Sequence, residues 1–127
     1  MKLHQDLRAD RNTITAYGDD YVDVNYRRHA ASLVVLPGRV VADWAGAGFD
    51  GLAEDDFRSL AELCAAERIA ILLLGTGARQ RFPAPALLRP LIEIGLGVEV
   101  MDTHAACRTY NILVAEDRSV AAALLIR

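Results

Sequence analysis

The sequence predicts an α/β fold: one three-layer domain built on a central mixed β-sheet. Two patterns carry this prediction. The first third of the chain alternates polar and apolar residues with the period of β-strands, whereas the remainder alternates short apolar runs with helical periodicity. The chain has 127 residues, of which 53% are hydrophobic, and this suits one folded unit. Residues 1–127 are therefore expected to form a single domain, with a β-rich N-terminal part followed by βαβαβ-type units.

The N-terminal part contains two hairpin signals. Residues 13–25 alternate on either side of the turn Gly18-Asp19-Asp20, which predicts a half-buried hairpin. Residues 32–44 contain two apolar, largely β-branched runs separated by Pro37-Gly38, and this dipeptide favours a turn. Four strands are thus expected before the first helix.

The pattern then changes to helical spacing. Within residues 54–64, four apolar residues share one helical face: Phe57, Leu60, Ala61 and Cys64. Residues 69–74 are apolar on both faces, as is typical of a central strand. Pro85 suits the first position of a second helix that ends at Gly95. Because Pro90 would remove an internal hydrogen bond, this helix is expected to kink or to begin late.

The C-terminal part continues the alternation. Residues 97–101 are expected to form a strand, and Asp102 or Thr103 can cap a helix that runs to about Ala115. Residues 120–126 are expected to form a final buried strand. This order of strands and helices is the βαβ pattern, which predicts parallel neighbours in the sheet.

Composition excludes several functions. The net charge of −3 gives no electrostatic attraction to nucleic acid, and no nucleic-acid-binding motif is present. Cys64 and Cys107 are too few and too far apart for a disulfide framework or a CxxC metal site. His4 and His29 are isolated and have no ligand spacing. No metal or cofactor is therefore expected.

The N-terminus predicts a cytoplasmic protein. Residues 1–14 contain no apolar core of the kind that a signal peptide needs, and they carry Asp6 and Asp10, which a mitochondrial presequence would avoid. Apolar runs such as residues 69–74 are too short to cross a bilayer. We expect no transmembrane segment, although peripheral association with a membrane is compatible with the sequence.

Five segments carry a resemblance that covers nearly the whole chain: LHQD, ITAYGDDYVDVN, SLVVLP, LLLGTGARQRFPAP and GLGVEVMDTHAACRTYNILVAEDRSVAAAL. They are similar to the mitochondrial complex I assembly factor 3 family and to its bacterial relatives, which have a Mth938-like domain. The resemblance implies one α/β domain with a mixed sheet. For the eukaryotic members it also implies a non-catalytic helper that builds NADH:ubiquinone oxidoreductase beside a second assembly factor. It implies no catalytic residues.

The first candidate site follows the central strand. It consists of Gly75, Thr76, Gly77, Arg79, Gln80 and Arg81. Two glycines would let backbone N–H groups approach an anion, and the arginines would add positive charge. However, neither a dinucleotide fingerprint nor a Walker loop is complete. The alternative is a turn that only leads the chain out of the sheet.

The second candidate site lies at the start of the last helix. It consists of Asp102, Thr103, Cys107, Arg108, Tyr110 and Asn111. Cys107, in the first turns of a helix and next to Arg108, could have a lowered pKa and act as a nucleophile or redox sensor. The alternative is that Asp102 or Thr103 caps the helix and Cys107 packs in the core.

Both candidate sites follow strands that are expected to be neighbours. They would then share one rim, where Arg81 and Arg108 flank a shallow pocket with Tyr110 and Asn111 nearby. Two functions remain open. The first is a non-catalytic interaction or assembly factor whose partners are complex I subunits or another assembly factor. The second is a binding domain or enzyme that holds a small anionic ligand with the Gly75–Gly77 loop and the Arg81/Arg108 rim.

Overall fold

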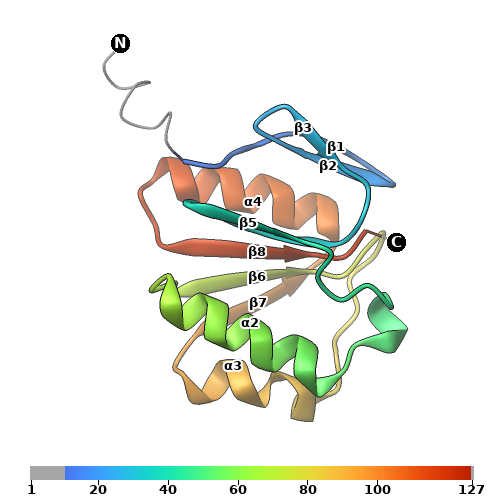
Figure 1. Ribbon diagram of the computed structural model, residues 1–127, viewed down its shortest axis with the longest axis vertical. Helices are drawn as coiled ribbons and strands as arrows, with labels where there is room; N and C mark the ends of the chain where they lie inside the picture. The colour runs from blue at the N-terminus through green and yellow to red at the C-terminus, as the bar shows by residue number, and fades with distance from the viewer. Residues whose placement is uncertain (1–10, 127) are drawn as a thin grey trace.

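Two β-sheets and three α-helices make up the part of the chain that the computed structural model describes, residues 11–126 (Figure 1). Their arrangement confirms the predicted α/β fold with a mixed central sheet. The inferences drawn from His4, from Asp6 and Asp10, and from the segment LHQD lie outside the described residues.

The smaller sheet is antiparallel and has the strand order β1-β2-β3. Its strands are β1 (Ile14–Gly18), β2 (Tyr21–Val24) and β3 (Arg27–His29). β1 and β2 pair on either side of Asp19-Asp20, so the first predicted hairpin is confirmed. Val22 and Val24 turn toward the core while Asp23 between them faces outward, because successive strand residues point to opposite faces.

The larger sheet has five strands in the order β5-β4-β8-β6-β7. Their bounds are β4 (Leu33–Leu36), β5 (Arg39–Ala42), β6 (Ile71–Gly75), β7 (Gly97–Met101) and β8 (Val120–Leu124). β4 is antiparallel to β5 and β8, whereas β6 is parallel to β7 and β8. β6 lies between two strands, which confirms that residues 69–74 include a central strand. The second hairpin, around Pro37-Gly38, is also confirmed.

Helices cover both faces of the five-stranded sheet (Figure 1). On one face lie α2 (Glu54–Ala66) and α3 (Arg89–Glu93), and on the other lies α4 (Thr103–Ala115), with the small sheet beside it. The predicted apolar face of α2 is buried against the sheet: Phe57, Leu60, Ala61 and Cys64. One 3-10 turn, η1 (Phe49–Gly51), precedes α2.

The second predicted helix begins late, as Pro90 requires. Residues from Pro85 form only a 3-10 turn, η2 (Pro85–Leu88), and α-helical structure starts at Arg89. Pro90 therefore stands in the first helical turn, where a missing N–H costs no hydrogen bond. Gly95 follows with a φ of 78°, which glycine adopts without strain, and it ends the helix.

The two last crossovers run on opposite sides of the sheet. α3 connects β6 to β7 on one face, and α4 connects β7 to β8 on the other (Figure 1). The loops that leave β6 and β7 therefore diverge at the carboxyl ends of two neighbouring strands. In open α/β sheets, such a divergence is where a crevice forms and ligands bind. Within residues 11–126, no helix is long and apolar enough to span a bilayer.

Candidate functional site

The crevice at the ends of β6 and β7 brings the two predicted candidate sites together. Thr76 and Gly77 leave β6, while Asp102 and Thr103 leave β7 and begin α4. The two segments are directly bonded, since the N–H of Thr103 donates to the carbonyl oxygen of Gly77 at 2.9 Å. The prediction that the glycine turn and the helix start meet at one edge is confirmed.

The Thr103 side chain occupies much of this crevice and leaves a pocket of only about 20 Å³ beside it. Its hydroxyl donates to the carbonyl oxygen of Leu125 at 2.7 Å and accepts from the N–H of Gly77 at 2.8 Å. Gly75 leaves no room for a larger residue, because a Cβ there would lie 3.0 Å from the Cα of Thr103. An anion cradle needs free backbone N–H groups. The Gly77 N–H is already engaged, so the geometry favours the structural role of the glycine turn.

The rest of the loop is also held by its own hydrogen bonds. The Thr76 hydroxyl donates to the carbonyl oxygen of Arg79 at 2.8 Å and accepts from the N–H of Arg81 at 3.0 Å. The Gln80 amide donates to the carbonyl oxygen of Val100 at 2.9 Å. Val100 belongs to β7, one of the two outer strands of the large sheet, so Gln80 covers part of an exposed strand edge. Three predicted binding residues, Thr76, Gln80 and Thr103, thus have structural partners.

Arg81 and Arg108 do not flank one pocket, so the predicted shared rim is wrong. The Arg81 guanidinium lies over the Phe49 ring, 4.1 Å from its centroid, and pairs with Asp50 at 3.6 Å. Arg108 instead donates to the Tyr17 hydroxyl at 3.2 Å, on the side of the small sheet. The two side chains diverge because the loop after β6 turns toward α2 while α4 covers the opposite face of the sheet.

Cys107 is fully buried against the sheet. Burial raises the pKa of this thiol to about 12, and the nearby Arg108 lowers it only in part. A thiol that stays protonated at neutral pH is a poor nucleophile. The structure therefore contradicts the hypothesis of a reactive Cys107 and agrees with the alternative that it packs in the core.

The other predicted residues of α4 serve packing and capping. The Asp102 carboxylate accepts from the N–H of Ala105 at 2.9 Å and caps the helix, as predicted. Tyr110 is fully buried and its hydroxyl donates to the carbonyl oxygen of Asn12 at 2.9 Å. Burial raises the pKa of Tyr110. Asn111 binds the backbone of Ile14, so both side chains fasten the small sheet to α4 rather than line a rim.

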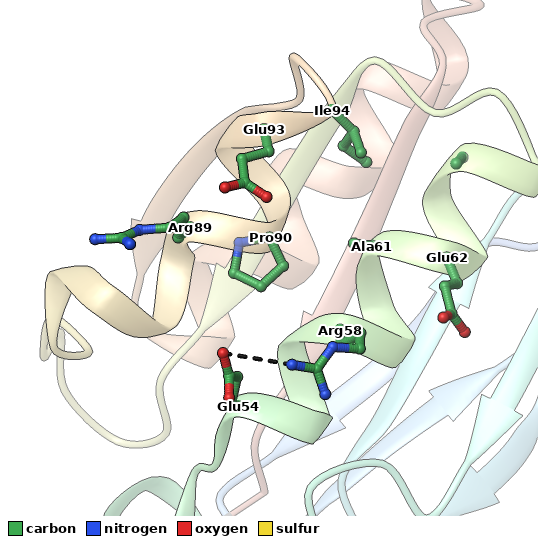
Figure 2. A pocket seen from close by; sticks show the side chains of 9 residues that line it. Glu54, Arg58, Ala61, Glu62, Arg89, Pro90, Glu93 and Ile94 are labelled. Atoms are coloured by element: carbon green, nitrogen blue, oxygen red, sulfur yellow. Dashed lines mark ion pairs between the residues drawn. The ribbon is translucent and has the colours of Figure 1, made fainter.

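Sequence reasoning missed a groove of about 390 Å³ between α2 and α3, the α2–α3 groove (Figure 2). Small and apolar residues lie among the charged ones that line it: Ala61, Ala65, Pro90 and Ile94. Arg58 turns toward Glu54, with which it pairs at 3.4 Å, while Arg89 points away from α2 (Figure 2). The signal in the sequence was Ile94, an apolar residue just after α3 that lines the groove and is 47% exposed.

Within residues 11–126, no three His, Cys, Asp or Glu side chains come close enough to hold a metal ion. Two free cysteines, Cys64 and Cys107, are both buried. The structure thus defines a mixed α/β domain in which the Thr103 side chain occupies much of the crevice after β6 and β7.

The fold belongs to a known structural class. It resembles a solved Bordetella parapertussis protein at 44% identity, with a TM-score of 0.82 over 92% of this chain and 97% of that chain. It also resembles a Bordetella pertussis protein described as a Mth938-like domain, at 38% identity, with a TM-score of 0.78 over 91% of this chain and 85% of that chain. The predicted Mth938-like fold is therefore confirmed.

Residues 14–125 match the family described as protein of unknown function DUF498/DUF598, and the chain belongs to this family. Two curated relatives are both called NADH dehydrogenase (ubiquinone) 1 alpha subcomplex assembly factor 3. The Homo sapiens protein is 35% identical over 98% of this chain and 66% of its own length. The Bos taurus protein is 35% identical over 88% of this chain and 59% of its own length. The chain thus spans about three fifths to two thirds of these relatives, and the predicted resemblance is confirmed.

Proposed function

We propose that this chain is a non-catalytic protein-binding factor that acts from the cytoplasm in the assembly of a membrane complex of the NADH:ubiquinone oxidoreductase kind. One observation carries the proposal: 35% identity to a human complex I assembly factor over 98% of the chain. Its partners would be subunits of that complex or a second assembly factor. It would associate with the membrane peripherally, through those partners.

The crevice at the ends of β6 and β7 supports a role without turnover. In an α/β enzyme this position would present free donors or nucleophiles to a substrate. Here the Gly77 N–H donates to the Thr103 hydroxyl, and the side chain of Cys107 is buried between α4 and the sheet. The Thr103 hydroxyl and the Gly77 N–H stabilise the fold instead.

The α2–α3 groove supports protein binding. Ile94, the residue that follows α3, lines the groove and is 47% exposed. Exposed apolar residues beside a charged rim are typical of a protein interface. A partner that covers Ile94 with apolar side chains would bury surface that the isolated domain leaves in water.

Affinity capture tests the proposal. The tagged full chain, expressed in its native host and solubilised in mild detergent, is expected to recover complex I subunits or a second assembly factor. A strain that lacks the chain is expected to assemble less of that complex. Recovery of no such protein, together with a normal amount of assembled complex in the deletion strain, would contradict the proposal.

Two matched variants test the groove. Ile94→Asp is expected to reduce capture of the partner about tenfold, which corresponds to about 1.4 kcal/mol of binding free energy. Ile112→Asp makes the same change at a residue of α4 that is 58% exposed, on the opposite face of the sheet, and it is expected to leave capture unchanged. Equal loss in both variants would argue against the α2–α3 groove as the contact surface.

A further inference from the structure

A second groove of about 390 Å³ lies where the edges of the two sheets meet, and we call it the β3–β5 groove. β3 is an outer strand of the small sheet, and β5 is an outer strand of the large one. Its lining consists of Val24, Asn25, Arg27, His29, Val40 and Ala42. The groove lies at the margin of the core that the two sheets and α4 enclose.

Strand register explains why two basic residues face this groove. Arg27 pairs with Val24 and His29 with Val22, and residues directly opposite each other in a sheet share a face. Val22 and Val24 belong to the core between the sheets. Arg27 and His29 therefore lie on the inner face of β3, at the margin of that core.

Strand register also explains which residues of β5 face the groove. Val40 pairs with Val35 and Ala42 with Leu33, and both partners belong to the same core cluster. Val40 and Ala42 consequently face the small sheet across the groove. One side of the groove is thus apolar, and the other carries a guanidinium and an imidazole.

Charge in the groove is one-sided, since no carboxylate lines it. Arg28, on the outer face of β3, lies 3.8 Å above the Tyr21 ring and pairs with Asp23 at 2.9 Å. Arg27 has no ion pair within residues 11–126. The side-chain amide of Asn25 forms hydrogen bonds with Asn12 and Thr13, which precede β1. The remaining side-chain donors among the lining residues are those of Arg27 and His29.

We propose that the β3–β5 groove binds an anionic amphiphile, a carboxylate or phosphate attached to an alkyl chain. The oxyanion lies on the Arg27 guanidinium, whose planar donors match two oxygens at once, with His29 as a further donor. The alkyl chain packs on Val24, Val40 and Ala42 and loses contact with water. This inference concerns a different surface from the α2–α3 groove and stands independently of the assembly role.

The alternative is that inward-pointing charge merely protects two sheet edges from pairing with other strands. The two interpretations differ in one measurable property. Edge protection requires no binding of a soluble ligand, whereas an amphiphile site requires saturable binding that depends on both the oxyanion and the alkyl chain.

Titration of the isotope-labelled full chain with octyl phosphate and with octanoate, followed by NMR, tests the proposal. Saturable shifts are expected at the amides of Val24, Arg27 and Val40. Octanol, which lacks the charge, and inorganic phosphate, which lacks the chain, are each expected to bind at least tenfold more weakly. Absence of saturable binding by either amphiphile, or equal binding of octanol, would overturn the proposal.

Neighbouring arginines supply a matched pair of variants. Arg27→Gln is expected to weaken octyl phosphate binding by about 10- to 100-fold, the range that loss of hydrogen bonds to a charged group gives. Arg28→Gln removes the same charge from the opposite face of β3 and is expected to change affinity less than twofold. Equal effects of the two variants would overturn the proposal, and thermal unfolding of each checks that the fold is kept.

Vesicles distinguish the two sources of such a ligand. If the ligand is a membrane lipid, the chain is expected to sediment with phosphatidylglycerol vesicles but not with phosphatidylcholine vesicles, and Arg27→Gln is expected to abolish the difference. If the ligand is a free metabolite, octyl phosphate binds in solution and neither vesicle retains the protein. Vesicle binding that Arg27→Gln and Arg28→Gln weaken equally would count against the groove.

Discussion

Single side chains in this protein often hold two backbone segments together. Thr103 is the clearest example, because one hydroxyl joins the loop after β6 to the residue after β8. The same oxygen accepts from Gly77 and donates to Leu125, so a single polar atom satisfies two buried backbone groups. It lies where α/β proteins commonly bind ligands, and its presence there explains why the crevice is narrow.

Replacement of Thr103 tests this role. Thr103→Val keeps the shape of the side chain but leaves the Gly77 N–H and the Leu125 carbonyl without their partner, and we expect a loss on the order of 3 kcal/mol in the free energy of unfolding. Thr103→Ser keeps the hydroxyl and is expected to lose about 1 kcal/mol, for the missing methyl group. Urea denaturation measures both. Equal losses would show that the hydroxyl contributes little.

Secondary structure elements are also joined by side chains that form hydrogen bonds of the kind that one strand forms with the next. Asn111 of α4 accepts from the N–H of Ile14 at 2.9 Å and donates to the carbonyl oxygen of the same residue at 2.7 Å. This pair of bonds is the pattern that a neighbouring strand would supply to β1. The small sheet is thereby fastened to a helix that covers the large sheet.

Asn111→Ala is expected to loosen the small sheet selectively. Amide hydrogen exchange of β1 and β2 should accelerate about tenfold or more, since each 1.4 kcal/mol of lost local stability changes the opening equilibrium tenfold. Exchange in β6 should keep its rate. Ile112→Ala, at the adjacent exposed position, serves as the control. Uniform acceleration across both sheets would mean that the bonds of Asn111 support the whole fold rather than one docking contact.

For the molecule as a whole, the burial of two thiols makes the free energy of unfolding decrease at alkaline pH. Burial raises the pKa of Cys64 to about 11 and that of Cys107 to about 12, both from 9.0. Because the folded-state values lie above the unfolded value, the stabilising contribution is complete below pH 9. It is lost as the pH rises from 9 toward 12, where the unfolded chain releases protons that the folded chain retains.

Stability is therefore expected to fall by about 1.4 kcal/mol per pH unit for each thiol above pH 9. The double variant Cys64→Ala, Cys107→Ala should show a shallower decline, although its stability at neutral pH is lower because two core side chains are shortened. Urea denaturation between pH 8 and 11 gives both slopes. Identical slopes in the two proteins would assign the alkaline loss to other groups.

Much of the fold was predictable because its signals are local. Alternation within residues 13–25, the Pro37-Gly38 turn and the spacing of Phe57, Leu60 and Cys64 each specify an element from contacts within a few residues. The same holds for the Asp102 cap, whose acceptor and donor are three residues apart. Elements and their order follow from such short-range chemistry.

Contacts between distant segments could not be predicted in this way. Three examples are the hydrogen bonds of Thr103 in the crevice, the hydrogen bonds of Asn111 to Ile14, and the separate partners of Arg81 and Arg108. Each depends on residues that lie 22 to 97 positions apart in the chain. The order of the strands and the face of the sheet on which each helix packs bring such residues together. No local pattern in the sequence specifies which distant residue becomes the partner. The chain's periodicities thus specify its strands and helices, whereas packing of the sheet between its two helical layers determines which polar groups remain free to bind a ligand.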